Sequence, residues 1–237
     1  MVSEAFEREE VRLPFLTKAD IEQVVEKHLK IFNPNALTNP TPIDVEGMAE
    51  RYFNLSIDYK RLTDDGSVLG MAVFNDSDKF FYYEDDMTIS VKSIKAGTIV
   101  LDDYATKTEA RLLFTLAHEI GHTLFHGDYI LSLYNDKNFA YRCQDSEKLK
   151  NEIIWTEERT MEWQAEYFAS ALLMPRKAVI ALKEEFNKQS CNPYLFVLSV
   201  EKTFRVSLKA ALNRAKEIGL VSNLSYHDLL CYKNSQK

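Results

Sequence analysis

The stretch His118-Glu119-Ile120-Gly121-His122 has the pattern H-E-x-x-H and lies within residues 107–125, which have the character of a helix. Residues 107–117 contain good helix formers and no Gly or Pro, and apolar side chains recur at helical spacing through the segment. In a helix, residues four positions apart share a face, so both histidines can bind one metal ion. Glu119 then lies within reach of a water on that ion. The pattern predicts a zinc hydrolase of peptide bonds with Glu119 as the general base.

Gly121 lies inside this predicted helix, where glycine costs about 1 kcal/mol relative to alanine. The residue therefore needs a packing reason. We expect either a close neighbour at this position or open room over the metal.

A catalytic zinc ion usually has three protein ligands and one water, so a third ligand has to come from elsewhere. One candidate is Asp128, shortly after His122, but the glycine that prepares a sharp turn at this spacing is replaced by Phe125. The other candidates lie on a second predicted helix, residues 157–174, which Pro175 closes. Glu162 and Glu166 border its apolar stripe, where a carboxylate needs a partner or a metal ion.

Two strings of sequence resemble the paired signatures of the ImmA/IrrE family of zinc metallopeptidases. The first is FTLAHEIGHTLFH, residues 114–126, and the second is EWQAEYFASALLMP, residues 162–175. The family patterns are H-E-x-G-H-x-x-x-H and E-x-x-A-x-x-F-A-x-x-L-L-M-P, and both are met at their fixed positions. Weaker similarity in the flanking strand and in a C-terminal helical segment extends the resemblance to about residues 42–220.

This resemblance implies a site and a function. His118, His122 and Glu162 correspond to the ligands of one Zn²⁺ ion per chain, and Glu119 corresponds to the catalytic glutamate. Family members typically act on a helix-turn-helix repressor, so the resemblance implies a zinc endopeptidase that regulates transcription. A non-cleaving regulatory protein, which binds a repressor or DNA through the same fold and the C-terminal helices, is the alternative. The intact Glu119 speaks against that alternative.

Four further residues are candidates for supporting the site or binding substrate. At Glu166 the chain departs from the family, whose members commonly carry Asn, and we expect this side chain to accept a hydrogen bond from a ligand histidine. His126 lies one helical turn beyond His122 and either contacts substrate or caps the helix. Tyr129 and Tyr134 lie in the long polar stretch 127–156, which has the character of an active-site lid, and either can stabilise an oxyanion.

Composition restricts the class of protein. The chain has 237 residues, 46% of them hydrophobic, which suffices for a sizeable core. The charged N-terminal segment does not resemble a signal peptide, and no long apolar run predicts a membrane span. The three cysteines, which are widely spaced, form no metal-binding pair and suggest free thiols in a reducing compartment. We therefore expect a cytoplasmic protein without a membrane partner.

Charge argues against a nucleic acid partner. The net charge is −7 at pH 7, although residues 190–237 carry seven Lys or Arg against three Asp or Glu. That basic segment, with Val206-Ser207 at a predicted turn, has some character of a helix-turn-helix. An amphipathic helix pair packed on the core is the simpler interpretation.

The pattern along the chain predicts an α+β fold: a small twisted sheet packed against the active-site helix and a second metal-ligand helix, as in a minimal zincin-like metallopeptidase. Helices are expected at residues 17–32 and 44–53, with Thr17 as an N-cap. Five strands are expected at residues 55–59, 68–74, 79–83, 88–91 and 98–101. We expect an N-terminal helix and connector (1–42), a metallopeptidase core (43–180) and a C-terminal helical segment packed on that core (181–237).

Overall fold

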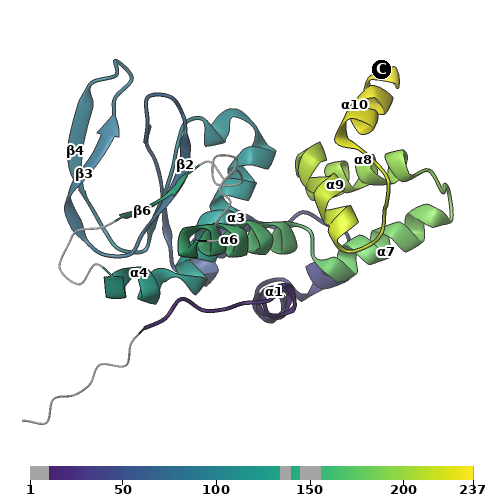
Figure 1. Cartoon of the computed structure of the whole chain (residues 1–237), viewed down its shortest axis with the longest axis horizontal. Coiled ribbons are helices and arrows are strands. Elements are labelled where there is room, and N and C mark those ends of the chain that lie inside the picture. Colours follow the sequence, from purple (N-terminus) through teal and green to yellow (C-terminus); the bar gives the residue numbers. More distant parts are fainter. Residues whose placement is uncertain (1–10, 134–139, 145–155, 237) are drawn as a thin grey trace, which may run out of the picture.

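The computed structural model describes residues 11–133, 140–144 and 156–236. The fold is α+β, as the sequence predicts, with the strands at one end and the C-terminal helices at the other (Figure 1). The described helical elements are α1 (Lys18–Phe32), η1 (Pro34–Leu37), α2 (Val45–Gly47), η2 (Met48–Tyr52), η3 (Ala105–Lys107), α3 (Glu109–Phe125), α4 (Gly127–Leu133), α6 (Glu157–Leu173), α7 (Arg176–Asn187), α8 (Pro193–Phe204), α9 (Leu208–Glu217) and α10 (Tyr226–Ser235).

The strands form two sheets. A four-stranded sheet has the order β1-β5-β2-β6, with β1 (Ser56–Tyr59) parallel to β5 (Thr98–Leu101). Strand β2 (Val68–Val73) pairs antiparallel with β5 and with β6 (Ala140–Gln144). A separate antiparallel hairpin consists of β3 (Ser77–Tyr83) and β4 (Ile89–Ile94). All five strands predicted from the sequence are present within a few residues of their expected bounds.

The central strands alternate their side chains between two cores, because successive residues of a strand point to opposite faces. On β5, Ile99 and Leu101 join the main core that α3 and α6 share, whereas Val100 points to the other face. On that face, Met71 and Val73 of β2 form a smaller core with residues of the β3–β4 hairpin. The hairpin thus covers one side of the sheet and leaves the other side to α3.

Helices α3 and α6 lie against each other in the centre of the molecule (Figure 1). Gly121 of α3 allows their close approach, since a Cβ built there would lie 3.1 Å from the Cα of Ala165 and 3.2 Å from Phe168 Cδ1. The sequence required a packing reason for this glycine, and the reason is the neighbouring helix rather than room over a metal ion.

The outer helices are attached to α6. Helix α1 begins at Thr17, the N-cap that the sequence predicts, which also forms a capping box by exchanging hydrogen bonds with Asp20, and the helix packs on α6. Arg214 of α9 is fully buried, donates to the carbonyl of Met174 at 3.0 Å and pairs with Glu22 of α1 at 2.7 Å. The C-terminal helices are therefore packed on the core, as the simpler interpretation of their sequence expects.

Three details differ from the sequence expectations. The polar stretch 127–156, which we expected to have the character of a lid, contains helix α4 and strand β6; β6 pairs with β2, and this pairing is not visible in local sequence. The expected helix at 44–53 is an α-helical turn that continues as the π-helix η2. The expected strand at 88–91 continues to Ile94.

Other sequence expectations concern cysteines and membranes. Cys191 and Cys231 are free and exposed, and Cys143 lies in β6, where side chains are outside the description. Within the described ranges, no helix combines the length and apolar character needed for a bilayer crossing.

Candidate metal centre

Helix α3 brings His118, Glu119 and His122 into the interior. Its N-terminus is fixed by Thr108, whose side chain accepts a hydrogen bond from the backbone N–H of Arg111. The helix then passes beneath the sheet, so its last two turns are enclosed. His118 is 3% exposed, and Glu119 and His122 are fully buried. Such a polar cluster in an interior needs partners or an ion.

Helix α6 supplies Glu162, which is 3% exposed. Thr156 caps this helix by accepting a hydrogen bond from the N–H of Arg159. Acidic residues occupy its first turn, where their negative charge interacts favourably with the helix dipole. Close packing at Gly121 sets the distance between the two helices. The Glu162 carboxylate consequently faces the histidine pair of α3.

The three side chains have the separations of a small-ion site. The Nε2 atoms of His118 and His122 lie 2.9 Å apart, and the Glu162 oxygens lie 3.2 Å from His118 Nε2 and 3.3 Å from His122 Nε2. Zinc–ligand bonds of about 2.0–2.1 Å in a tetrahedron place ligand atoms about 3.3 Å apart. Among the described residues, these three form the group of metal-ligating side chains that can hold one ion. The donor set of two imidazoles and one carboxylate fits zinc.

The electrostatics favour positive charge at the centre of this group. Burial disfavours ionised Glu162, but the two adjacent rings outweigh it and hold the pKa of Glu162 well below its usual range. Burial also disfavours charged His118, yet Glu162 outweighs this effect and raises the pKa of His118. Burial lowers the pKa of His122. Ionised Glu162 and neutral His122 are in the forms that bind a metal cation, whereas a cation would displace a proton from His118.

Glu119 lies against strand β2, on the sheet side of α3. A Cβ built on Gly70 would come within 2.7 Å of Glu119 Oε1, so the absent side chain of Gly70 makes room for the carboxylate. Both carboxylate oxygens are buried, and no described side chain donates a hydrogen bond to them; burial raises the pKa of Glu119 to about 8, an effect that the backbone of Ala72 partly offsets. A buried carboxylate with spare acceptor capacity beside the histidines is suited to accept a proton from a water.

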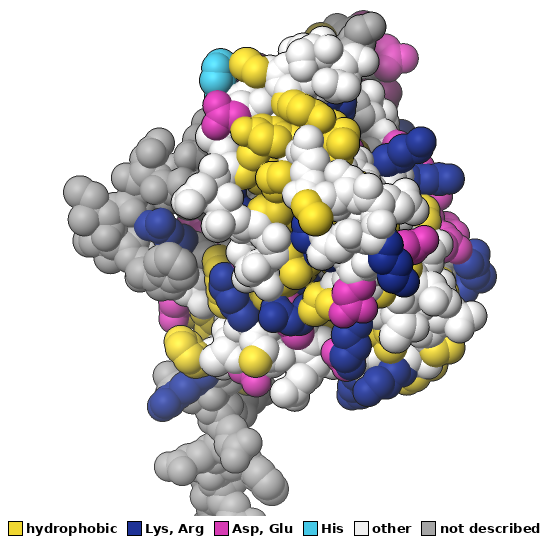
Figure 2. Space-filling model, turned by 90° about the vertical axis from the view of Figure 1, so that its right-hand side faces the viewer, with side chains coloured by type: hydrophobic (Ala, Val, Ile, Leu, Met, Phe, Trp, Pro, Cys, Tyr) yellow, Lys and Arg dark blue, Asp and Glu magenta, His cyan; other side chains and the backbone are white. Residues whose placement is uncertain are grey.

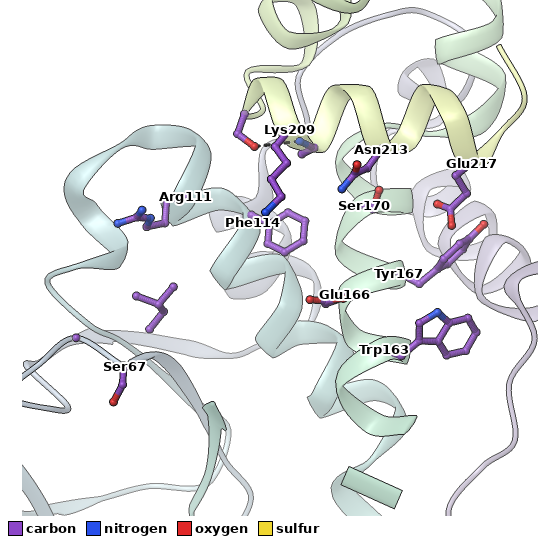
Figure 3. Close-up of a pocket in the computed structure, with 14 residues that line it drawn as sticks. Ser67, Arg111, Phe114, Trp163, Glu166, Tyr167, Ser170, Lys209, Asn213 and Glu217 are labelled. Atoms are coloured by element: carbon purple, nitrogen blue, oxygen red, sulfur yellow. Dashed lines mark hydrogen bonds between the residues drawn. The ribbon is translucent and has the colours of Figure 1, made fainter. Parts of the chain in front are cut away.

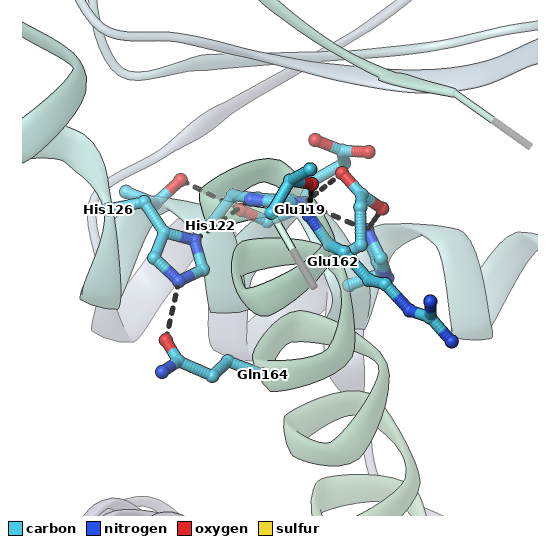
Figure 4. A network of polar contacts seen from close by, with 9 residues as sticks. Glu119, His122, His126, Glu162 and Gln164 are labelled. Carbon is cyan, nitrogen blue, oxygen red and sulfur yellow. Dashed lines mark hydrogen bonds and ion pairs between the residues drawn. The ribbon is translucent and has the colours of Figure 1, made fainter. Parts of the chain in front are cut away.

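A chain of polar contacts continues behind His122 (Figure 4). His122 Nδ1 lies 2.9 Å from His126 Nδ1, and His126 Nε2 lies 2.9 Å from Gln164 Oε1. The Gln164 amide donates in turn to the carbonyl of Pro14 at 2.8 Å. His126 and Gln164 are fully buried, and burial lowers the pKa of His126 to about 3. His126 was among the residues predicted from the sequence, whereas Gln164 was not; its signal is a polar amide among the buried residues of α6.

The remaining candidates from the sequence are Glu166, Tyr129, Asp128 and Tyr134. Glu166 lines a cavity of about 640 Å³ between α3, α6 and α9, together with Trp163 and Asn213 (Figure 3), and its charge raises the pKa of His118. The hydroxyl of Tyr129 donates to Glu157 at 2.6 Å. Asp128, the alternative third ligand, is exposed and is not part of the metal group. Tyr134 lies outside the described residues.

The match to a protein family agrees with this geometry. The model of a peptidase family, M78, described as the IrrE N-terminal-like domain, matches residues 69–216. No curated protein sequence matches the chain. A solved structure, a Mycobacterium tuberculosis transcriptional regulator, is similar at 14% identity with a TM-score of 0.45, over 83% of this chain and 47% of that one. The chain thus spans about half the length of that regulator.

Proposed function

Because the chain belongs to the M78 peptidase family of IrrE N-terminal-like domains, we propose that it is a zinc-dependent endopeptidase that hydrolyses peptide bonds in a protein substrate. The observation that carries this proposal is the convergence of His118, His122 and Glu162 from two helices, with Glu119 buried beside them. A dimetal or purely structural site is not favoured, because three protein ligands leave a position for water.

The chemistry follows from the positions of the side chains. Zinc, when bound by the three ligands, lowers the pKa of a coordinated water and polarises the substrate carbonyl. Glu119 accepts a proton from the attacking water and returns it to the leaving amine, so its carboxylate ends the cycle as it began. Burial raises the pKa of Glu119, and a cation bound beside it would favour the ionised carboxylate that accepts the proton. The ligands themselves do not line the cavity at Glu166, but Phe114 and Glu166, each one helical turn from a ligand, do, and we propose that this cavity holds a segment of the substrate.

We propose a helix-turn-helix transcriptional repressor as the substrate. This assignment rests on the family resemblance of the two signature strings. The alternative, a non-cleaving regulator that binds a repressor or DNA through the C-terminal helices, has less support. On the surface those helices present, basic and acidic side chains are interspersed (Figure 2). Lys209 and Asn213 of α9 line the cavity facing α6 (Figure 3).

Glu119→Gln tests the mechanism, and Glu158→Gln is its matched control, since Glu158 is exposed in the first turn of α6. Both purified variants are incubated with a candidate repressor and analysed for bound zinc. Glu119→Gln is expected to retain zinc and lose about 10²–10⁴-fold in cleavage rate, whereas Glu158→Gln cleaves like the wild type. Cleavage by Glu119→Gln at the wild-type rate contradicts the assignment of the base. A wild-type protein that binds zinc and repressor without cleaving it supports the alternative.

A further inference from the structure

We infer that Gln164 is a positioning residue for the metal site: through His126, it fixes the tautomer of His122 that leaves Nε2 free to bind the ion. The inference rests on the proposed function, because it assigns a role toward the same metal site. Gln164 reaches that site across 38 positions of sequence, from helix α6 to the end of α3.

The orientation of the Gln164 amide is determined by Pro14. A backbone carbonyl accepts hydrogen bonds and cannot donate, so the group that lies 2.8 Å from the carbonyl of Pro14 has to be the amide nitrogen of Gln164. The amide oxygen of Gln164 therefore faces His126 Nε2 at 2.9 Å. Since that oxygen only accepts, His126 Nε2 carries a proton.

The position of the proton on His126 determines the position of the proton on His122. His126 is fully buried and its Nε2 contacts an uncharged amide, which favours the neutral ring. A neutral imidazole with its proton on Nε2 has a lone pair on Nδ1. His122 Nδ1, 2.9 Å away, consequently donates to His126 Nδ1. Its own Nε2 is left with a lone pair and points at His118 Nε2 and Glu162.

This arrangement selects one of the two neutral tautomers of His122. A free imidazole exchanges its proton between both nitrogens, and only the form with a bare Nε2 can bind the ion in this geometry. Partners of this kind orient ligand histidines, and their removal typically weakens metal affinity about 10–100-fold. Gln164 does this without touching the ion, because its contacts are with His126 and Pro14.

The test is a double-mutant cycle on zinc affinity, with Gln164→Met, His126→Phe and the double variant, each titrated against a zinc chelator of known affinity. Gln164→Met is expected to weaken zinc binding about 10–100-fold. In the His126→Phe background the same substitution should have no further effect, because Gln164 acts through His126. A Gln164→Met effect that persists undiminished without the His126 ring overturns the inference, as does wild-type affinity in Gln164→Met.

A second readout needs neither a variant nor activity. Nitrogen-15 spectra of the histidine rings in the wild-type protein, recorded with and without zinc, should show a proton on Nδ1 of His122 and on Nε2 of His126. The opposite assignment overturns the inference even if the variants fold poorly.

Arg214→Met serves as the control for the affinity measurements, since it removes a buried polar contact at the C-terminal end of α6 and should lower stability while leaving zinc affinity unchanged. Failure of the wild type to bind zinc contradicts the proposed function itself, whereas equal zinc binding by wild type and Gln164→Met contradicts only the role of Gln164.

Discussion

Gly121→Ala tests whether the close packing of α3 against α6 outweighs the low helix propensity of glycine at this position. The new Cβ would lie 3.1 Å from the Cα of Ala165, against about 3.4 Å for the closest ordinary contact, and 3.2 Å from Phe168 Cδ1. Ala165 presents backbone, which cannot rotate away, so the helices must separate by a few tenths of an ångström. Overpacking of this kind costs about 1–3 kcal/mol. The substitution recovers about 1 kcal/mol of helix propensity, so we expect a net loss of about 1 kcal/mol.

The assay is urea unfolding of the zinc-free protein, followed by thermal unfolding. A loss of about 1 kcal/mol lowers the Tm by about 2–4 °C in a chain of this size. Zinc affinity should fall only modestly, because a shift of a few tenths of an ångström stays within the about 0.5 Å that a constellation of ligands tolerates. If Gly121→Ala is instead more stable than the wild type by about 1 kcal/mol, helix propensity alone governs the position and the packing argument is refuted.

Three further predictions concern the metal ion, Glu166 and Arg214. Chelation of zinc should lower the Tm, because a protein in free zinc at 100 times its Kd loses about 2.7 kcal/mol of stabilisation when the zinc is removed. An unchanged Tm in calorimetry contradicts a resident ion. Glu166→Gln should weaken zinc affinity in a chelator titration, because the negative charge of Glu166, which helps to raise the pKa of His118, also attracts a cation. Unchanged affinity would show that Glu166 has no role in metal binding. Arg214→Met should cost about 3 kcal/mol in urea unfolding, because Glu22 loses its charged partner at 2.7 Å and keeps the hydroxyl of Tyr167. A loss below about 0.5 kcal/mol would indicate that α9 is held by its apolar contacts alone.

The sequence predicted the elements that carry the site because their signals are local. The apolar repeat around His118 and His122 predicted α3, and the second repeat predicted α6 with its end at Pro175. Thr17 predicted the start of α1 as its N-cap. Each of these signals lies within a few residues, so no knowledge of distant neighbours was needed.

Contacts between distant segments were not predictable in the same way. Strand β6 was missed because its pairing with β2 joins segments that lie far apart in the chain. Gln164 was missed because one of its two contacts lies 150 positions away, at Pro14. The reason for Gly121 was open between two interpretations until Ala165 and Phe168 could be seen against it.

By itself, then, the sequence determined the residue types and their spacing along each helix: two histidines four positions apart, a glutamate beside the first and an acid on a second helix. Only the tertiary structure decided that Glu162 rather than Asp128 faces the histidines, at 3.2 and 3.3 Å. It also decided that Gln164 reaches His126. The physical reason is that helical periodicity fixes a side chain's direction from its own helix, whereas the distance between two helices depends on the side chains packed between them.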